Sequence, residues 1–360
     1  MRTFGVEEEF FIVDPYTGLP VAPPAAARAH LLALSVDGTR TVGEFLACQV
    51  ESNGPVCTHG GEALASARTY RATLARATLD MGLQAVPLGT PPRFPEPPAV
   101  VSPGDRYRAI TSLCEGIATE HYLCGLHVHV GIEDTCSGVI ALNEIRRWLP
   151  VLTACGSNSP YWRGSDTGFA SWRNIHYRRW AVQGIPPHFT DELDYERRVR
   201  FMLDSDVVLD AGHISWGARL SAHHPTLEVR VADAQLNAAN SVLLALIVRS
   251  LVDTSLNGVP RTAPLLAEAL DLAQWQAAKF GLHGNHLDPL DGTKTSATRM
   301  LRSLLDYIQH ALKQNGDFEY VSAGLERLME HGTGADIQRA RFHRGGFNAV
   351  LDEAAAAIAA

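Results

Sequence analysis

Alternating apolar and polar positions predict several short β-strands in the first two thirds of the chain. The first, Phe4–Val13, is rich in β-favouring residues and ends at the turn sequence Asp14-Pro15-Tyr16-Thr17-Gly18. Similar patterns predict strands at 41–50, 83–88, 122–132, 214–220 and 226–232. The last two flank His223-His224-Pro225, so we expect them to pair around a turn.

Helical periodicity predicts helices at 25–34, 62–81, 107–120, 139–154 and 191–203. From Asn237 onward the pattern is almost entirely helical, with one loop at 283–295. Segment 157–180 has no clear period but is rich in aromatic residues and arginines, which indicates a functional loop region. The scattered strands favour an α+β fold, in which helices pack on one face of a mostly antiparallel sheet and the C-terminal third is helical.

The composition is that of a globular protein and excludes some partners. The net charge is −8 and no basic run occurs, so we expect no nucleic-acid-binding surface. Its most apolar run, 242–248, is too short to cross a bilayer, and the N-terminus does not resemble a signal peptide. The six cysteines form no Cys-x-x-Cys pair and are expected to be reduced. We therefore expect a soluble, cytoplasmic protein.

Carboxylates interrupt the apolar pattern of the first strand. Glu7 and Glu9 share one strand face, whereas Glu8 points to the other. A hard cation such as Mg²⁺ would relieve the repulsion between two neighbouring carboxylates. An exposed edge strand with solvated charges is the alternative. Glu44 and Glu51 are two further candidates, but on one unbroken strand they would point to opposite faces, so they converge only if a bulge or turn intervenes.

Two later strands combine polar residues on one face. His127 and His129 alternate with Leu126, Val128 and Val130, and such a pair can bind a transition metal or line a cleft. Cys124 would complete a zinc site, but strand parity places it on the apolar face. Glu228 and Arg230 likewise share a face, which suits either an ordinary salt bridge or a metal-binding carboxylate beside a phosphate-binding arginine.

The sequence contains no phosphate loop, no Gly-x-Gly-x-x-Gly, no Gly-x-Ser-x-Gly and no His-Glu-x-x-His motif. A bound nucleotide would therefore be held by metal ions and arginines on a sheet.

Six segments together resemble the glutamate–cysteine ligase type 2 family, also described as carboxylate–amine ligases. They occur in family order: Gly5-Val6-Glu7-Glu8-Glu9-Phe10, Gln49-Val50-Glu51, His127-Val128-His129-Val130-Gly131, Ser159-Pro160-Tyr161-Trp162-Arg163-Gly164, Thr167-Gly168-Phe169-Ala170-Ser171-Trp172-Arg173 and Leu227-Glu228-Val229-Arg230-Val231. The resemblance implies one catalytic domain over residues 1–360. It also implies a glutamine-synthetase-like fold, a curved antiparallel sheet with helices on its outer face.

The resemblance further implies ATP and two or more Mg²⁺ (or Mn²⁺) ions as cofactors. The residues at positions similar to the family's metal ligands are Glu7, Glu9, Glu44, Glu51, His127 and Glu228. Arg230 falls at a phosphate-contacting position, while Arg163 and Arg173 are expected to meet a substrate carboxylate or phosphate. His129 is typical of this branch of the family and is assigned to the nucleotide side of the site.

The resemblance implies that the protein uses ATP to join the side-chain carboxylate of glutamate to an amine. It also implies weak glutamate–cysteine ligase activity. The substrates would be a small amino acid and an amine, and the sequence does not identify the amine. The sequence also does not decide whether identical chains assemble. The alternatives are a guanidino-kinase-like phosphotransferase on the same kind of sheet, a zinc hydrolase using His127 and His129, and a non-catalytic binding protein. Retention of the acidic residues argues against the last.

Overall fold

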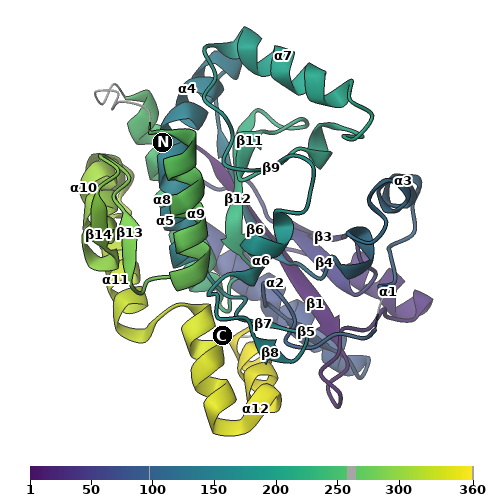
Figure 1. Cartoon of the computed structure of the whole chain (residues 1–360). Helices are drawn as coiled ribbons and strands as arrows, with labels where there is room; N and C mark the ends of the chain where they lie inside the picture. Colours follow the sequence, from purple (N-terminus) through teal and green to yellow (C-terminus); the bar gives the residue numbers. More distant parts are fainter. Residues whose placement is uncertain (97, 258–264, 359–360) are drawn as a thin grey trace.

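A central antiparallel sheet organises the computed structural model, which describes residues 1–96, 98–257 and 265–358 (Figure 1). Its strand order is β11-β12-β6-β1-β4-β3-β2, and β5 pairs with β1 on the edge opposite β4, beyond the end of β6. The strands are β1 (Phe4–Val13), β2 (Ser35–Val36), β3 (Thr39–Gly43), β4 (Gln49–Asn53), β5 (Gln84–Val86), β6 (Gly125–Gly131), β11 (Ala218–Leu220) and β12 (Thr226–Asp233). All pairings in this sheet are antiparallel, as predicted.

Helices make up most of the remaining secondary structure. They are α1 (Ala25–Leu32), α2 (Gly60–Asp80), α3 (Asp105–Cys114), α4 (Thr135–Ile145), α5 (Leu149–Cys155), α6 (Trp172–Tyr177), α7 (Glu192–Leu203), α8 (Ala238–Leu256), α9 (Ala267–Phe280), α10 (Ala297–Asn315), α11 (Phe318–His331) and α12 (Gly334–Ile358), with 3₁₀ turns at Ala118–Glu120, Arg146–Trp148 and Ala211–His213. Three two-stranded ladders complete the fold: β7 (Tyr161–Trp162) with β8 (Ser165–Asp166), β9 (Gln183–Gly184) with β10 (Ser215–Trp216), and β13 (Asn285–Leu287) with β14 (Lys294–Ser296).

The two faces of β1 have different neighbours. Phe4, Phe10 and Ile12 are buried in apolar clusters shared with the covering helices. Glu8 lies on this same face, where Arg71 of α2 donates two hydrogen bonds to its carboxylate, at 3.0 and 2.6 Å. Ser241 of α8 donates to it as well, at 2.5 Å. The opposite face therefore carries Glu7 and Glu9, as strand parity predicts.

Helix α8 is the central helix of the covering layer. It contacts β6, β1, α2, α4, α10 and α11. An 18-residue window of α8 has a mean hydropathy of 1.4, and the helix is long enough to cross a membrane, but 72% of that window is buried within the protein. Its apolar character is therefore accounted for by core packing, as in the core helix of a soluble protein.

Several predicted elements are subdivided in the structure. The strand predicted at 41–50 is two strands, β3 and β4, joined by residues 44–48. The predicted helix 139–154 is interrupted by a 3₁₀ turn just before α5, whose first turn contains Pro150. The predicted helix 107–120 stops at Cys114, because Glu115 adopts a positive φ of 38°. The loops predicted at 283–295 and 157–180 contain the ladders β13–β14 and β7–β8, and the second also contains α6.

Candidate active site

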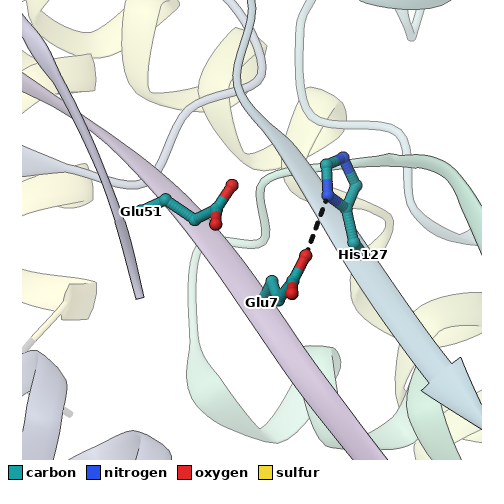
Figure 2. Close-up of side chains that lie close together, drawn as sticks. All are labelled: Glu7, Glu51 and His127. Atoms are coloured by element: carbon teal, nitrogen blue, oxygen red, sulfur yellow. Dashed lines mark hydrogen bonds and ion pairs between the residues drawn. The ribbon is translucent and has the colours of Figure 1, made fainter. Parts of the chain in front are cut away.

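Strand register brings the predicted carboxylates and histidines together. β1 lies between β4 and β6, so Glu7 faces His127 and Glu9 faces Glu51 as direct cross-strand partners. Glu228 on β12 is likewise the partner of His129. Directly opposed residues on one sheet face have Cβ atoms about 5 Å apart, so side chains of this length can meet. Figure 2 shows Glu7, Glu51 and His127 converging over the sheet.

Two groups of possible metal ligands form on this face. Glu7, Glu51 and His127 offer donor atoms within 4.8 Å of one another, and so do Glu9, Glu44 and Glu51. Glu44 reaches the second group because it lies in the connection between β3 and β4, which removes the parity problem posed by one continuous strand. Glu51 belongs to both groups. Carboxylate-rich groups that share one ligand suit two neighbouring hard cations such as Mg²⁺.

The carboxylates of this cluster raise one another's proton affinity. Burial and the nearby Glu44 raise the pKa of Glu9 from 4.5 to about 8. Burial and the surrounding carboxylates, Glu7 foremost, raise the pKa of Glu51 well above its ordinary value. Burial also raises the pKa of Glu44. A divalent cation would offset this repulsion and favour the ionised carboxylates, so the donor set fits a metal ion.

The two histidines surround Glu7. His127 Nδ1 lies 3.4 Å from Glu7 Oε2, and His129 Nε2 lies 3.4 Å from the same oxygen. Burial tends to raise the pKa of Glu7, but these two imidazoles outweigh it and the pKa lies below its ordinary value. Burial lowers the pKa of His127 to about 4, which keeps its ring neutral and able to bind a cation. Its Nε2 atom has no hydrogen-bond partner among the described residues.

The structure does not assemble the donor set of the zinc alternative. His129 Nδ1 is 2.9 Å from the hydroxyl of Thr226, and His129 belongs to neither group of possible ligands found among the described residues. The amide of Gln49 contacts Cys124 Sγ at 3.3 Å, and Cys124 belongs to neither group. The carboxylate-rich environment of His127 suits an oxygen-binding cation better than zinc.

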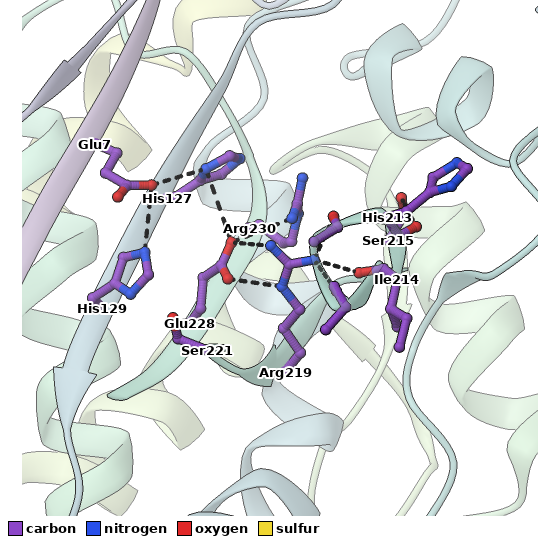
Figure 3. Close-up of polar contacts among 12 residues, drawn as sticks. Glu7, His127, His129, His213, Ile214, Ser215, Arg219, Ser221, Glu228 and Arg230 are labelled. Carbon is purple, nitrogen blue, oxygen red and sulfur yellow. Dashed lines mark hydrogen bonds and ion pairs between the residues drawn. The ribbon is translucent and has the colours of Figure 1, made fainter. Parts of the chain in front are cut away.

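Glu228 lies beside the first group, but its negative charge is already paired with two arginines (Figure 3). Arg219 donates to both carboxylate oxygens at 2.8 and 3.2 Å, and Arg230 Nη1 donates to one of them at 3.3 Å. Burial opposes ionisation, yet Arg219 and Arg230 together lower the pKa of Glu228 to about 2. His127 Nδ1 is 4.0 Å away, so Glu228 borders the cluster without joining either donor group.

Arg219 is a site residue that the sequence patterns did not single out. It is the direct cross-strand partner of Glu228 in the β11–β12 pair, and its Nη1 atom also donates to the carbonyls of Ala211, Gly212 and Ile214. The predicted turn at 223–225 contained part of the signal, because pairing its flanking strands brings residue 219 near 228, while the exact register is seen only in the structure.

Arg173, which is buried, and Arg230, which is 11% exposed at its side chain, form a cationic wall beside the carboxylates. Arg230 Nη2 donates to the hydroxyl of Tyr177 at 3.1 Å. Arg173 is only 4% exposed, and its guanidinium donates to the carbonyl of Arg230 at 3.3 and 3.4 Å. Its Nε atom has no hydrogen-bond partner among the described residues. A buried guanidinium with spare donors, next to Glu9, suits an anionic ligand.

Arg163 lies apart from this wall. It occupies the turn between β7 and β8 with a positive φ of 50°, and its side chain is 55% exposed. Its guanidinium pairs with Glu120 and lies 5.8 Å from the ring centre of Phe94. The structure therefore does not bring Arg163 to either donor group, although the sequence prediction placed it with Arg173.

A cavity of about 940 Å³ opens next to the first donor group. Glu7 and His129 line its inner end, and Arg40, Asn53 and His224 contribute to its walls. Its volume lies at the upper end of those typical for small-molecule sites. The cavity and the carboxylate cluster thus meet at Glu7, whose carboxylate His129 also contacts.

Comparisons with known sequences identify a family for the chain. The family description "Glutamate-cysteine ligase family 2" matches residues 3–353. A Nocardia farcinica protein named "Putative glutamate--cysteine ligase 2-1" is 40% identical over 93% of this chain and 88% of its own length. A Mycobacterium sp. (strain KMS) protein named "Putative glutamate--cysteine ligase 2-2" is 39% identical over 99% of both chains.

Two solved structures resemble the whole chain. The glutamate–cysteine ligase of Francisella tularensis in complex with AMP has a TM-score of 0.76 at 12% identity, over 99% of this chain and 88% of that one. A bifunctional glutathione synthetase of Pasteurella multocida has a TM-score of 0.72 at 14% identity, over 99% of this chain and 52% of that one. At these identities the likeness concerns the fold, and it confirms the predicted fold class.

Proposed function

The chain belongs to glutamate–cysteine ligase family 2 and is a carbon–nitrogen ligase; from this premise we propose that it uses ATP to join the side-chain carboxylate of glutamate to an amine. One observation carries the proposal: two donor groups that share Glu51 lie beside the buried guanidinium of Arg173 and the largely buried guanidinium of Arg230. This combination can hold cations, phosphate oxygens and a substrate carboxylate within one site.

The residues fit the chemistry of carboxylate activation. A carboxylate reacts poorly with amines until the γ-phosphoryl group of ATP is transferred to it, giving an acyl phosphate and ADP. The amine then attacks the acyl carbon, and phosphate leaves as the amide forms. Such a reaction depends on positioning and on charge stabilisation, and it needs no protein nucleophile. Mg²⁺ or Mn²⁺ held by Glu7, Glu9, Glu44, Glu51 and His127 would supply the positive charge that phosphoryl transfer requires.

The nucleotide is proposed to occupy the 940 Å³ cavity, with its phosphates at the end lined by Glu7 and His129. The AMP in the fold neighbour from Francisella tularensis supports nucleotide binding, and the placement rests on Glu7, which belongs both to the cavity lining and to the first donor group. Arg230 would contact the transferred phosphoryl group.

Arg173 is proposed to bind a carboxylate of the acid substrate, because its buried guanidinium retains unused donors. Arg163 could reach a substrate only from the outer rim. Glu228 would contribute to metal binding only by exchanging some of its contacts with Arg219.

The decisive experiment is ATP-dependent phosphate release by the purified protein, with glutamate and a panel of amines that includes cysteine. We expect phosphate, ADP and an amide, identified by mass spectrometry. A guanidino-kinase-like enzyme would instead give ADP and a phosphorylated acceptor without free phosphate. Zinc copurifying with the protein, together with hydrolysis in the absence of ATP, would favour the hydrolase alternative.

Other features stay predictions. We propose that residues 1–360 act as one catalytic domain in the cytoplasm, that the only substrates are small molecules, and that glutamate–cysteine ligation itself is weak. The same amine panel would identify the preferred amine. A measurement of mass in solution would show whether identical chains assemble.

A further inference from the structure

Asp233, at the end of β12, is a buried carboxylate that makes no contact with either donor group in the described part of the chain. It is fully buried and accepts three hydrogen bonds, from Asn158 N at 2.7 Å, Ser159 Oγ at 2.6 Å and Ser171 Oγ at 2.8 Å. Gly89 makes room for it, because a Cβ atom at that position would stand 2.7 Å from the Asp233 side chain. A buried carboxylate with this many donors has a fixed orientation.

The two serines connect Asp233 to the start of α6. Ser159 Oγ accepts a hydrogen bond from Arg173 N at 3.0 Å. Ser171 Oγ caps α6, accepting from Asn174 N at 3.3 Å and from the Asn174 side chain at 2.9 Å. Each hydroxyl therefore accepts a hydrogen bond from a backbone amide of α6. Each then donates its own proton to the carboxylate of Asp233.

Helix α6 is short and carries the cationic wall of the site. It has only six residues, and isolated helices of this length are unstable without tertiary support. Arg173 is the second residue of its first turn, and the hydroxyl of Tyr177 at its end accepts a hydrogen bond from the guanidinium of Arg230. The Arg173 guanidinium also lies 5.5 Å from the ring centre of Tyr177. A shift of α6 would therefore move Arg173 relative to the carboxylate cluster and would disturb the Tyr177 contact that orients Arg230 on β12.

We propose that Asp233 is a positioning residue that fixes α6, through Ser159 and Ser171, so that Arg173 and Tyr177 set the cationic side of the active site. The carboxylate itself touches no substrate. It orients two hydroxyl groups so that their lone pairs accept hydrogen bonds from backbone amides in the first turn of α6. The guanidinium groups proposed to face the substrate are thereby preorganised.

The test compares Asp233→Asn with Asp317→Asn in the full-length chain. Asp317 is a matched control, because it is also a buried carboxylate, paired with Arg249 between α8 and α11. In Asp233→Asn the amide keeps the size but cannot accept all three hydrogen bonds. We expect faster hydrogen exchange at residues 171–177 and a kcat/KM for the acid substrate lowered by roughly 100-fold, the scale of a small misplacement. Binding of Mg²⁺-ATP, which we assign to the Glu7 end, should be unchanged.

The control should lose thermal stability without either effect. The proposal is overturned if exchange at 171–177 is unchanged in Asp233→Asn, or if both variants change the kinetic constants equally. If Asp233→Asn does not fold, Ser171→Ala decides by the same readouts, because it removes one hydroxyl and keeps the carboxylate. The kinetic part rests on the proposed ligase function. If the wild-type protein shows no ligase turnover, that function fails, and hydrogen exchange alone decides the positioning role.

Discussion

Gly125 lies against the guanidinium group of Arg173, so closely that a Cβ atom on Gly125 would stand 2.2 Å from Arg173 Nη2. The amide of Gly125 also donates a hydrogen bond to Glu9 Oε2 at 2.6 Å. The missing side chain at the start of β6 therefore allows a buried arginine and a buried carboxylate to approach the same stretch of backbone.

Gly125→Ala should consequently displace Arg173 from the site. We expect a stability loss of about 1–3 kcal/mol from overpacking, and a kcat/KM lowered by roughly 100-fold from misplacement of the guanidinium. Urea denaturation and phosphate-release kinetics measure the two effects. Gly61→Ala is the control, because among the described residues no heavy atom outside its own helix lies within 4 Å of its added Cβ. Wild-type kinetics in Gly125→Ala would contradict this role for the glycine.

Glu7 and Glu8 should respond oppositely to replacement by glutamine. Glu7→Gln relieves repulsion with Glu51 but also removes the carboxylate that His127 and His129 stabilise, so the stability of the metal-free protein should change little, while turnover falls by orders of magnitude. Glu8→Gln breaks a buried ion pair with Arg71 and should cost about 3 kcal/mol of folding free energy. Thermal melts without metal and phosphate-release rates separate these outcomes.

A silent Glu8 variant would contradict this assignment. Strand parity alone suggests that Glu8 is an inert control, because it points away from the site. The structure shows that it points into the helical layer instead, where both of its oxygens accept hydrogen bonds. The informative comparison is therefore catalytic loss at Glu7 against stability loss at Glu8.

Period-two alternation along the sequence is sufficient to predict much of the site. Parity assigns Glu7 and Glu9 to one face and Glu8 to the other, and it places His127 and His129 on a common face. These positions lie on long, central strands, where one residue of slippage would expose the core. The β1–β4 and β1–β6 registers then place Glu51 beside Glu9 and His127 beside Glu7 on that same face.

Residues outside the central strands are harder to predict. Glu44 lies in a connection whose path depends on neighbours far along the chain: Arg28 donates to the carbonyl of Ala47, and Tyr107 donates to that of Gly43. Tyr177 and Asp233 acquire their roles through contacts with residues more than 50 positions away. No local pattern encodes such contacts, since they depend on tertiary packing.

The shared carboxylate predicts linked binding of two metal ions. We expect two Mn²⁺ ions per chain by calorimetry, and ligase activity that requires free Mg²⁺ beyond the amount bound to ATP. Glu51→Gln should weaken both sites because Glu51 belongs to both donor groups, whereas Glu44→Gln should weaken only one. Full activity at equimolar Mg²⁺ and ATP, or equal effects of the two variants, would argue against this arrangement.

The metal-free protein should lose stability as the pH rises from about 4.5 to about 8. The pKa of Glu9 is raised to about 8 and that of Glu51 well above normal, so the folded state retains protons that the unfolded state has released. Stability then falls as pH rises through this window. Urea midpoints in EDTA should show the fall, and Mg²⁺ should reduce it by binding the ionised carboxylates. Glu51→Gln should flatten the profile in EDTA, and a rise in stability with pH would contradict the assignment.

Arg230→Lys tests whether the cationic wall needs a forked group. Arg230 Nη1 contacts Glu228 at 3.3 Å while Nη2 contacts the Tyr177 hydroxyl at 3.1 Å, and a single ammonium group cannot span both. Arg219 still donates hydrogen bonds to both oxygens of Glu228, so the charge of that carboxylate remains paired and the fold should survive. We expect turnover to fall roughly 100- to 1,000-fold, as when one preorganised donor is removed.

Arg219→Lys should show the complementary pattern. Its guanidinium supports three backbone carbonyls in addition to Glu228, so its replacement should lower the melting temperature as well as turnover. Melting curves and phosphate-release rates should be measured for both variants. A catalytic arginine affects turnover alone, whereas a supporting arginine also affects the melting temperature. If Arg230→Lys turns over normally while Arg219→Lys does not, phosphoryl contact belongs to Arg219, and the polar face of β12 must be reassigned.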